Sequence, residues 1–233
     1  MSVPGAIACI GGGGFLTDDF RGFQESHLLT LIPPSRRRER PRVLYLGLAH
    51  GDAESRQFRA YKMFAGLGCE ITTLPFFPYE MKRDYPAEAR AADLIYVGGG
   101  NTPAMIAVWR EFGFDRALHE AWQGGTVLSG ISAGANCWFE DYVTDSVPGG
   151  GVRAGLGWLP GTFCPHLDSE PWRAPLLAGV TRAPAYGVRE GAMMVVRPGA
   201  GPEFIADKPG VTANVRLPGE EAREVPCLDL SSR

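Results

Sequence analysis

The sequence predicts an α/β fold in which a doubly wound, mostly parallel sheet carries helices on both faces in three layers, with a β-rich C-terminal extension. Two observations lead to this prediction. Short apolar runs alternate with longer amphipathic stretches through the first half of the chain, and the second half changes to short β-like runs separated by Gly and Pro. No internal repeat or low-complexity linker interrupts the 233 residues, so we expect a single domain over residues 1–233.

Five apolar runs are expected to be buried strands, because each is too short for a helix and is bounded by Gly, Pro or charged residues. They are Ala6–Ile10, Val43–Leu48, Ile71–Leu74, Leu94–Val97 and Thr126–Leu128. Strands that alternate with helices pair in parallel through right-handed crossovers. The alternation therefore predicts the doubly wound sheet.

Apolar residues at helical spacing predict two helices, over 52–67 and 103–122. In the first, the apolar positions are Phe58, Tyr61, Phe64 and Leu67. After residue 150, the runs 162–164, 186–188 and 193–196 are short and β-like. We expect them to extend the same sheet.

The composition excludes several classes of protein. With 23 Lys+Arg against 26 Asp+Glu, the net charge of −3 gives no excess positive charge for a nucleic-acid backbone. The basic run of residues 36–40 lies among prolines and is interpreted as a solvated loop. The N-terminus does not resemble a signal peptide and no apolar stretch of about 18 residues occurs, so we expect a cytoplasmic protein with no membrane partner.

The cysteine pattern also argues against a metal centre. Five scattered cysteines with no CxxC pair are typical neither of a disulfide framework nor of a thiolate zinc site. Most are expected to be small buried hydrophobic residues. We expect no metal and no cofactor.

Residues 127–136, VLSGISAGAN, form a strand that leads into Gly-x-Ser-x-Gly and then into small residues. This is the nucleophile-elbow pattern, in which flanking glycines allow a sharp turn that exposes the serine at the carboxyl ends of the strands. The serine would be Ser132. The N–H of Ala133 would then supply half of an oxyanion hole at a helix N-terminus. The alternative is a packing turn with no chemistry.

A second glycine-rich turn follows the strand at 94–97. Three glycines, residues 98–100, give unencumbered N–H donors of the kind that the other half of an oxyanion hole needs. Thr102 suits a helix N-cap and Pro103 the first helical position. No nucleotide-binding fingerprint is present, and the glycines at 11–14 are interpreted as a close-packing turn.

A serine nucleophile needs a base, and the chain offers four histidines: His27, His50, His119 and His166. His166 follows a short apolar strand and a proline that fixes the chain, where its side chain could reach the serine edge. His119 is expected at the surface or in an internally satisfied position, while His27 and His50 stay open. For the orienting acid, Glu190 comes at a strand end, and Asp141, Asp145 and Asp168 are alternatives.

Four motifs in order are similar to those of the aspartyl dipeptidase (peptidase E) family of serine peptidases. They are Gly98-Gly99-Gly100-Asn101-Thr102, Gly130-x-Ser132-Ala133-Gly134-Ala135-Asn136, Pro165-His166 and Glu190-Gly191. The resemblance covers about residues 7–196. It implies a fold similar to that of the class I glutamine amidotransferases. The family that the motifs resemble also includes the cyanophycinase-like enzymes.

The resemblance implies that Ser132 is the nucleophile, His166 the general base and then acid, and Glu190 the orienting carboxylate. It implies oxyanion donors at Gly100 and Ala133, no cofactor, and short peptides as substrates.

Three residues are candidates for binding the polar groups of the substrate: Asn101, Asn136 and Arg173. The stretch between histidine and acid, where the aspartyl dipeptidases carry basic residues, looks shorter here, so acyl transfer is better supported than aspartate specificity. Amidase, esterase or carboxypeptidase-like activity and a non-catalytic small-ligand site remain alternatives. A cysteine nucleophile is disfavoured, and the oligomeric state, a homodimer included, stays open.

Overall fold

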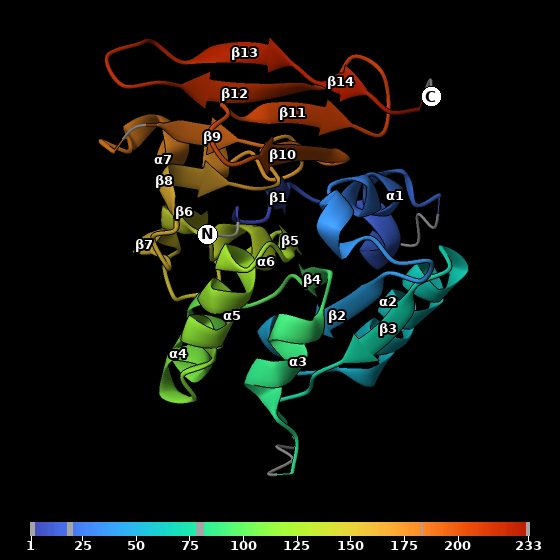
Figure 1. Ribbon diagram of the computed structural model, residues 1–233. Coiled ribbons are helices and arrows are strands. Elements are labelled where there is room, and N and C mark those ends of the chain that lie inside the picture. Colours follow the sequence, from blue (N-terminus) through green and yellow to red (C-terminus); the bar gives the residue numbers. More distant parts are fainter. Residues whose placement is uncertain (1–2, 18–20, 78–81, 183, 232–233) are drawn as a thin grey trace.

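The computed structural model describes residues 3–17, 21–77, 82–182 and 184–231, and its core is an eight-stranded sheet (Figure 1). The strand order is β14-β11-β10-β1-β5-β4-β2-β3. Five parallel strands form one half: β1 (Ile7–Ile10), β2 (Arg42–Leu46), β3 (Glu70–Thr73), β4 (Leu94–Val97) and β5 (Val127–Ile131). The five strands predicted from the sequence are these five, with β5 running three residues further than expected.

The C-terminal strands of this sheet add its antiparallel part. β10 (Ala192–Val196) pairs antiparallel with β1, and β11 (Glu203–Ala206) pairs antiparallel with β10. β14 (Leu228–Asp229) closes this edge in parallel with β11. The predicted extension of the parallel sheet is therefore confirmed for the run at 193–196.

A second, six-stranded mixed sheet lies beside the first, and the sequence did not predict it. Its order is β13-β12-β9-β8-β6-β7. The strands are β6 (Phe139–Thr144), β7 (Gly151–Ala154), β8 (Leu159–Cys164), β9 (Ala185–Gly187), β12 (Thr212–Arg216) and β13 (Arg223–Pro226). The expectation that runs 162–164 and 186–188 extend the first sheet was wrong, since they lie in β8 and β9 of this second sheet.

Helices cover both faces of the first sheet, as expected. On one face, α1 (Phe23–Thr30) and α2 (Glu54–Gly66) pack Leu28, Met63 and Phe64 against the sheet. On the other face lie α3 (Tyr85–Ala91), α4 (Thr102–Glu111) and α5 (Phe114–Gln123). The short α6 (Ala133–Asn136) follows β5, and α7 (Arg173–Gly179) packs on the second sheet. Three 3₁₀ turns complete the described helices: η1 (Gly14–Thr17), η2 (Pro34–Arg36) and η3 (Leu48–His50).

Two details of the helix prediction were wrong. The single helix expected over 103–122 is two helices, because Gly113 takes a left-handed conformation (φ 65°) between α4 and α5. On α2, Phe58 is 68% exposed and Tyr61 55% exposed, so these two rings do not face the core. None of the helices in the described ranges has both the length and the apolar character needed to cross a membrane.

Candidate active site

Ser132 lies in the turn between β5 and α6, at the carboxyl edge of the first sheet. Its backbone has φ 54° and ψ −112°, a sparsely populated conformation for a residue with a side chain. A Cβ at Gly130 would overlap the carbonyl oxygen of Gly134, and one at Gly134 would overlap that of Val97. Both flanking glycines are therefore required for this turn to pack against its neighbours.

The end of β1 holds three segments of the site together through consecutive carbonyl groups. The N–H of Ser132 donates to the carbonyl of Ile10 at 3.0 Å, and the N–H of His166 donates to that of Gly11 at 3.2 Å. The N–H of Gly191, next to Glu190, donates to the carbonyl of Gly12 at 3.0 Å. The glycines after β1, predicted as a close-packing turn, thus position segments that are far apart in the sequence.

The side chains of His166 and Glu190 form a close pair. Nδ1 of His166 lies 2.5 Å from Oε1 of Glu190, and Oγ of Ser169 donates to the same oxygen at 3.0 Å. Asp168 accepts the backbone N–H of Glu190 at 2.9 Å. The hydrogen bond from His166 holds the pKa of the Glu190 carboxyl below its usual value, so this carboxylate stays ionised at neutral pH.

The alternative acids have other partners. The carboxylate of Asp168 receives the N–H of Glu190, Asp141 pairs with Arg182 at 2.7 Å, and Asp145 lies 3.5 Å from Arg173. Among the acids weighed from the sequence, Glu190 is the one that contacts His166. His166 itself has φ 55°, and the proline before it fixes the approach of the chain.

Several backbone N–H groups beside Ser132 have no acceptor in the described part of the chain, and those of Gly100 and Ala133 are among them. Gly100 has φ 138°, and a Cβ there would overlap the carbonyl oxygen of Ala49. An ideal Cβ on Gly99 would lie 3.3 Å from the Ser132 Cβ, so the glycine triplet borders the serine. These donors have the character that an oxyanion hole needs. Within the described residues no hydrogen bond joins the Ser132 hydroxyl to His166, and such bonds often tighten only with substrate.

The three residues expected to bind substrate are engaged inside the protein. Asn101, and not Thr102 as predicted, is the N-cap of α4: its Oδ1 accepts the N–H of Ala104 at 2.9 Å, and its Nδ2 donates to the carbonyl of Ser146. Asn136 is buried beside Thr102.

Arg173 is 3% exposed and donates to Glu170 at 2.7 Å and to the carbonyl of Val143 at 3.0 Å. Its guanidinium therefore supports the second sheet from within, and binding a substrate would break these bonds.

His50 is a polar residue near the site whose role as a base the sequence left open. Its Nε2 lies 2.8 Å from the hydroxyl of Tyr45, and burial lowers the pKa of His50 to about 4. An ideal Cβ on Gly98 would lie 3.1 Å from His50 Nε2, so this ring packs against the glycine triplet. Its position after a β-strand was the only sequence observation pointing to it.

The buried cysteines are poor nucleophiles. Burial raises the pKa of the Cys137 thiol well above its usual value and that of Cys164 to about 12. Four of the five cysteines are buried, as expected. Within the described ranges, no group of three His, Cys, Asp or Glu side chains comes together as a metal site would require.

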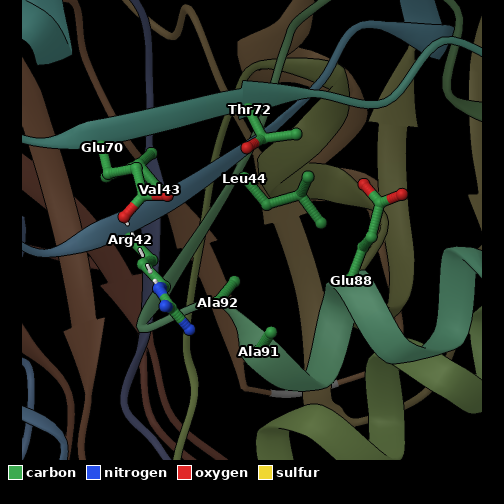
Figure 2. Close-up of a pocket in the computed structure, with 8 residues that line it drawn as sticks. All are labelled: Arg42, Val43, Leu44, Glu70, Thr72, Glu88, Ala91 and Ala92. Atoms are coloured by element: carbon green, nitrogen blue, oxygen red, sulfur yellow. Dashed lines mark ion pairs between the residues drawn. The ribbon is translucent and has the colours of Figure 1, made fainter.

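Two hollows of the structure lie at different places relative to the candidate site. The groove in Figure 2, of about 170 Å³, begins at Arg42 at the amino end of β2, where Arg42 pairs with Glu70 at 3.6 Å. It therefore lies at the opposite edge of the sheet from Ser132. An apolar pocket of about 420 Å³ lies between α7 and β12, with Leu167 and Leu177 in its wall.

The fold and the glycine-flanked turn at Ser132 have the arrangement typical of α/β enzymes with a serine at a nucleophile elbow. The chain belongs to peptidase family S51, a family of serine peptidases, whose model matches residues 10–200. It is 38% identical over 192 residues to the uncharacterized peptidase YgaJ of Bacillus subtilis (strain 168), an alignment that covers 81% of each chain. The resemblance identified from the four motifs is thereby confirmed.

Two solved structures share the fold. A peptidase from an acI-B1 actinobacterium has a TM-score of 0.74 at 19% identity, with 97% of this chain and 95% of that chain covered. A candidate peptidase E protein from Listeria monocytogenes EGD-e has a TM-score of 0.64 at 15% identity, with 87% of this chain and 98% of that chain covered.

Proposed function

We propose that this S51 peptidase is a serine exopeptidase that hydrolyses short peptides through an acyl-enzyme on Ser132. His166 takes the proton of the Ser132 hydroxyl as that oxygen attacks the substrate carbonyl carbon. The oxyanion of the tetrahedral intermediate accepts the N–H groups of Gly100 and Ala133. The amine leaves with the proton from His166, and water, deprotonated by the same imidazole, then hydrolyses the ester. Glu190 keeps the imidazole oriented and stabilises its charged form.

The observation that carries this proposal is the 2.5 Å contact between His166 and Glu190, built on the same β1 carbonyl groups that fix the backbone of Ser132. The short-peptide, exopeptidase mode is supported by the four motifs shared with the peptidase E family. Because Arg173 is buried and paired, nothing in its contacts favours a preference for an aspartate side chain.

The direct test is to replace Ser132 with alanine and to follow both peptide hydrolysis and labelling by a fluorophosphonate probe. Loss of the nucleophile of a triad typically costs about 10⁴- to 10⁶-fold in kcat. Ser129→Ala is a matched control, because Ser129 is buried three residues earlier on β5 and its hydroxyl has no partner among the described residues. Near-normal hydrolysis by the Ser132→Ala protein would contradict the proposal.

The substrate class requires a panel of dipeptides, N-blocked and C-blocked peptides, and simple esters. Exopeptidase action predicts cleavage of free-ended dipeptides and loss of cleavage when the recognised end is blocked. Faster turnover of esters or of internal amides alone would instead indicate an esterase or amidase on the same serine. A protein that binds these compounds without labelling of Ser132 would be a non-catalytic binding member.

A further inference from the structure

One turn of the chain, residues 166–170, contacts Glu190 through three different side chains. Oγ of Ser169 donates to Oε1 of Glu190 at 3.0 Å, and the same oxygen lies 2.5 Å from Nδ1 of His166. Oδ1 of Asp168 accepts the backbone N–H of Glu190 at 2.9 Å. The turn therefore holds both the carboxylate and the backbone of Glu190, and two of the three side chains have no part in the proposed mechanism.

The turn itself has a fixed backbone. The N–H of Glu170 donates to the carbonyl of His166 at 3.0 Å and closes the turn. The side chain of Glu170 accepts Nε of Arg173 at 2.7 Å, and Arg173 is buried. Asp168 and Ser169 are exposed, but they project from a segment that is held at both of its ends.

The carboxylate of Glu190 packs on the glycine run after β1. An ideal Cβ on Gly12 would lie 2.4 Å from Oε2 and 2.5 Å from Oε1 of Glu190, so this position leaves room for the carboxylate only as glycine. The Glu190 side chain is nevertheless 28% exposed, and water competes for its oxygens. Packing alone therefore does not determine which oxygen faces the imidazole.

The Ser169 hydroxyl supplies the missing restraint. The terminal torsion of a glutamate side chain is broad, so a second donor on Oε1 limits its rotation. The pKa of the Glu190 carboxyl is lowered first by the hydrogen bond from His166, and the bond from Ser169 lowers it further. Ser169 thus favours the ionised carboxylate in the orientation that contacts His166.

We propose that Ser169 and Asp168 are positioning residues of the peptidase reaction: Ser169 fixes Oε1 of Glu190 against His166, and Asp168 fixes the backbone from which Glu190 projects. This inference rests on the proposed function, in which Glu190 orients the imidazole. Both residues act through Glu190, as supporting hydrogen bonds do around a preorganised site.

The test for Ser169 compares a variant that loses the hydroxyl with one that keeps it. With the dipeptide that the wild type cleaves fastest, Ser169→Ala should lower kcat about tenfold and leave KM within about twofold, as for loss of a hydrogen bond to a charged group. The rate of Ser132 labelling by the fluorophosphonate probe should fall in parallel. Ser169→Thr should restore both rates to within about threefold of the wild type.

The test for Asp168 follows the same design. Asp168→Ala removes the acceptor of the Glu190 N–H and should lower kcat about fivefold, whereas Asp168→Asn keeps an acceptor oxygen and should stay within about twofold of the wild type. Ser231→Ala is the matched control, because the exposed Ser231 hydroxyl also donates to a carboxylate, that of Asp229 at 2.6 Å, but after β14. It should leave kcat and labelling unchanged.

A double-mutant cycle shows whether Ser169 acts through Glu190. In a Glu190→Ala protein, the further change Ser169→Ala should alter the labelling rate less than about twofold, because the carboxylate that it positions is gone. An equal loss in both backgrounds would overturn the inference. So would a higher KM with kcat unchanged, which would place Ser169 in contact with the substrate.

The labelling rate also separates this inference from the proposed function. A wild-type protein that is labelled at Ser132 and cleaves peptides, with Ser169→Ala and Asp168→Ala equally active, loses only the positioning roles. A wild-type protein that is neither labelled nor active contradicts both proposals.

Discussion

The carboxylate of Glu190 is the group on which the orientation of His166 depends, since its Oε1 contacts Nδ1 of the imidazole. Glu190→Gln keeps the shape of the side chain and removes its charge. We expect kcat/KM to fall about 10³- to 10⁴-fold, as for a triad whose acid becomes an amide. Glu203→Gln is a suitable control, because Glu203 pairs with Arg197 at the surface. A fall in kcat/KM of less than tenfold would indicate that a group other than Glu190 orients His166.

The lowered pKa of the same carboxylate also predicts how the stability of the protein depends on pH. The hydrogen bond from His166 lowers the pKa of Glu190 in the folded state, so its stabilisation is present above the unfolded value of about 4.3 and is lost as pH falls through the lower folded value. The free energy of unfolding of the wild type, from urea titrations, should exceed that of Glu190→Gln near pH 5, and the difference should close in stronger acid. A difference independent of pH would exclude this linkage.

At the level of single residues, local motifs predicted the serine turn. They did not predict which groups the longer side chains contact. The turn around Ser132 depends on glycines whose backbone freedom can be recognised in the sequence. Arg173 looked free to bind substrate because its partners, Glu170 and the carbonyl of Val143, are set by how α7 meets β6. Contacts across elements of this kind are not encoded by neighbouring residues, so they became known only from the structure.

At the level of elements, α4 connects the stability of a helix to the glycine triplet. The Asn101 side chain caps α4 directly after that triplet, and the N–H of Asn101 donates to the carbonyl of Ala49 at 2.7 Å. Asn101→Ala should cost about 1 kcal/mol of unfolding free energy. It should also lower kcat more than it raises KM, because the Gly100 donor would be less well fixed.

Asp84→Ala is the matched control for this prediction. Asp84 caps α3 by accepting the N–H of Ala87 at 2.9 Å, but α3 carries none of the proposed catalytic groups. Its replacement should destabilise the protein by a similar amount and leave kcat unchanged. Equal effects of the two substitutions on kcat would show that α4 has no special relation to the site.

The elements also show where periodicity fails as a guide. Four of the parallel strands were predicted well because they are mostly buried on both faces and mostly apolar, whereas β3 is exposed or half-buried along its length. The faces of α2 were not predicted well, since Phe58 and Tyr61 follow helical spacing and yet point to solvent, while Ala60 and Met63 are buried. Strand partners are a property of pairing between distant segments, so the second sheet could not be distinguished from an extension of the first.

At the level of the whole molecule, the site draws on both sheets. Ser132 follows β5 of the first sheet, His166 follows β8 of the second, and Glu190 lies between β9 of the second sheet and β10 of the first. One apolar cluster contains residues from both sheets, among them Leu128 and Phe163. The geometry of the proposed triad therefore depends on the packing of one sheet against the other.

This arrangement predicts that the two sheets unfold together, as expected for a single domain. Tryptophan fluorescence is a sensitive reporter, because Trp109 of α4 stacks on Trp138 before β6 at 6.3 Å, and Trp122 of α5 stacks on Trp158 before β8 at 6.0 Å. In urea, fluorescence, far-UV circular dichroism and labelling of Ser132 should give one coincident transition.

Phe163→Leu probes this coupling from the second sheet. Phe163 is fully buried and stacks on Phe139 at 4.8 Å, so the smaller side chain should cost about 1–3 kcal/mol. Since the sheets share one core, the loss should move all three urea transitions to lower concentration by the same amount. If labelling were lost at lower urea than the circular dichroism signal of the first sheet, the second sheet would unfold separately, and residues 1–233 would form two cooperative units.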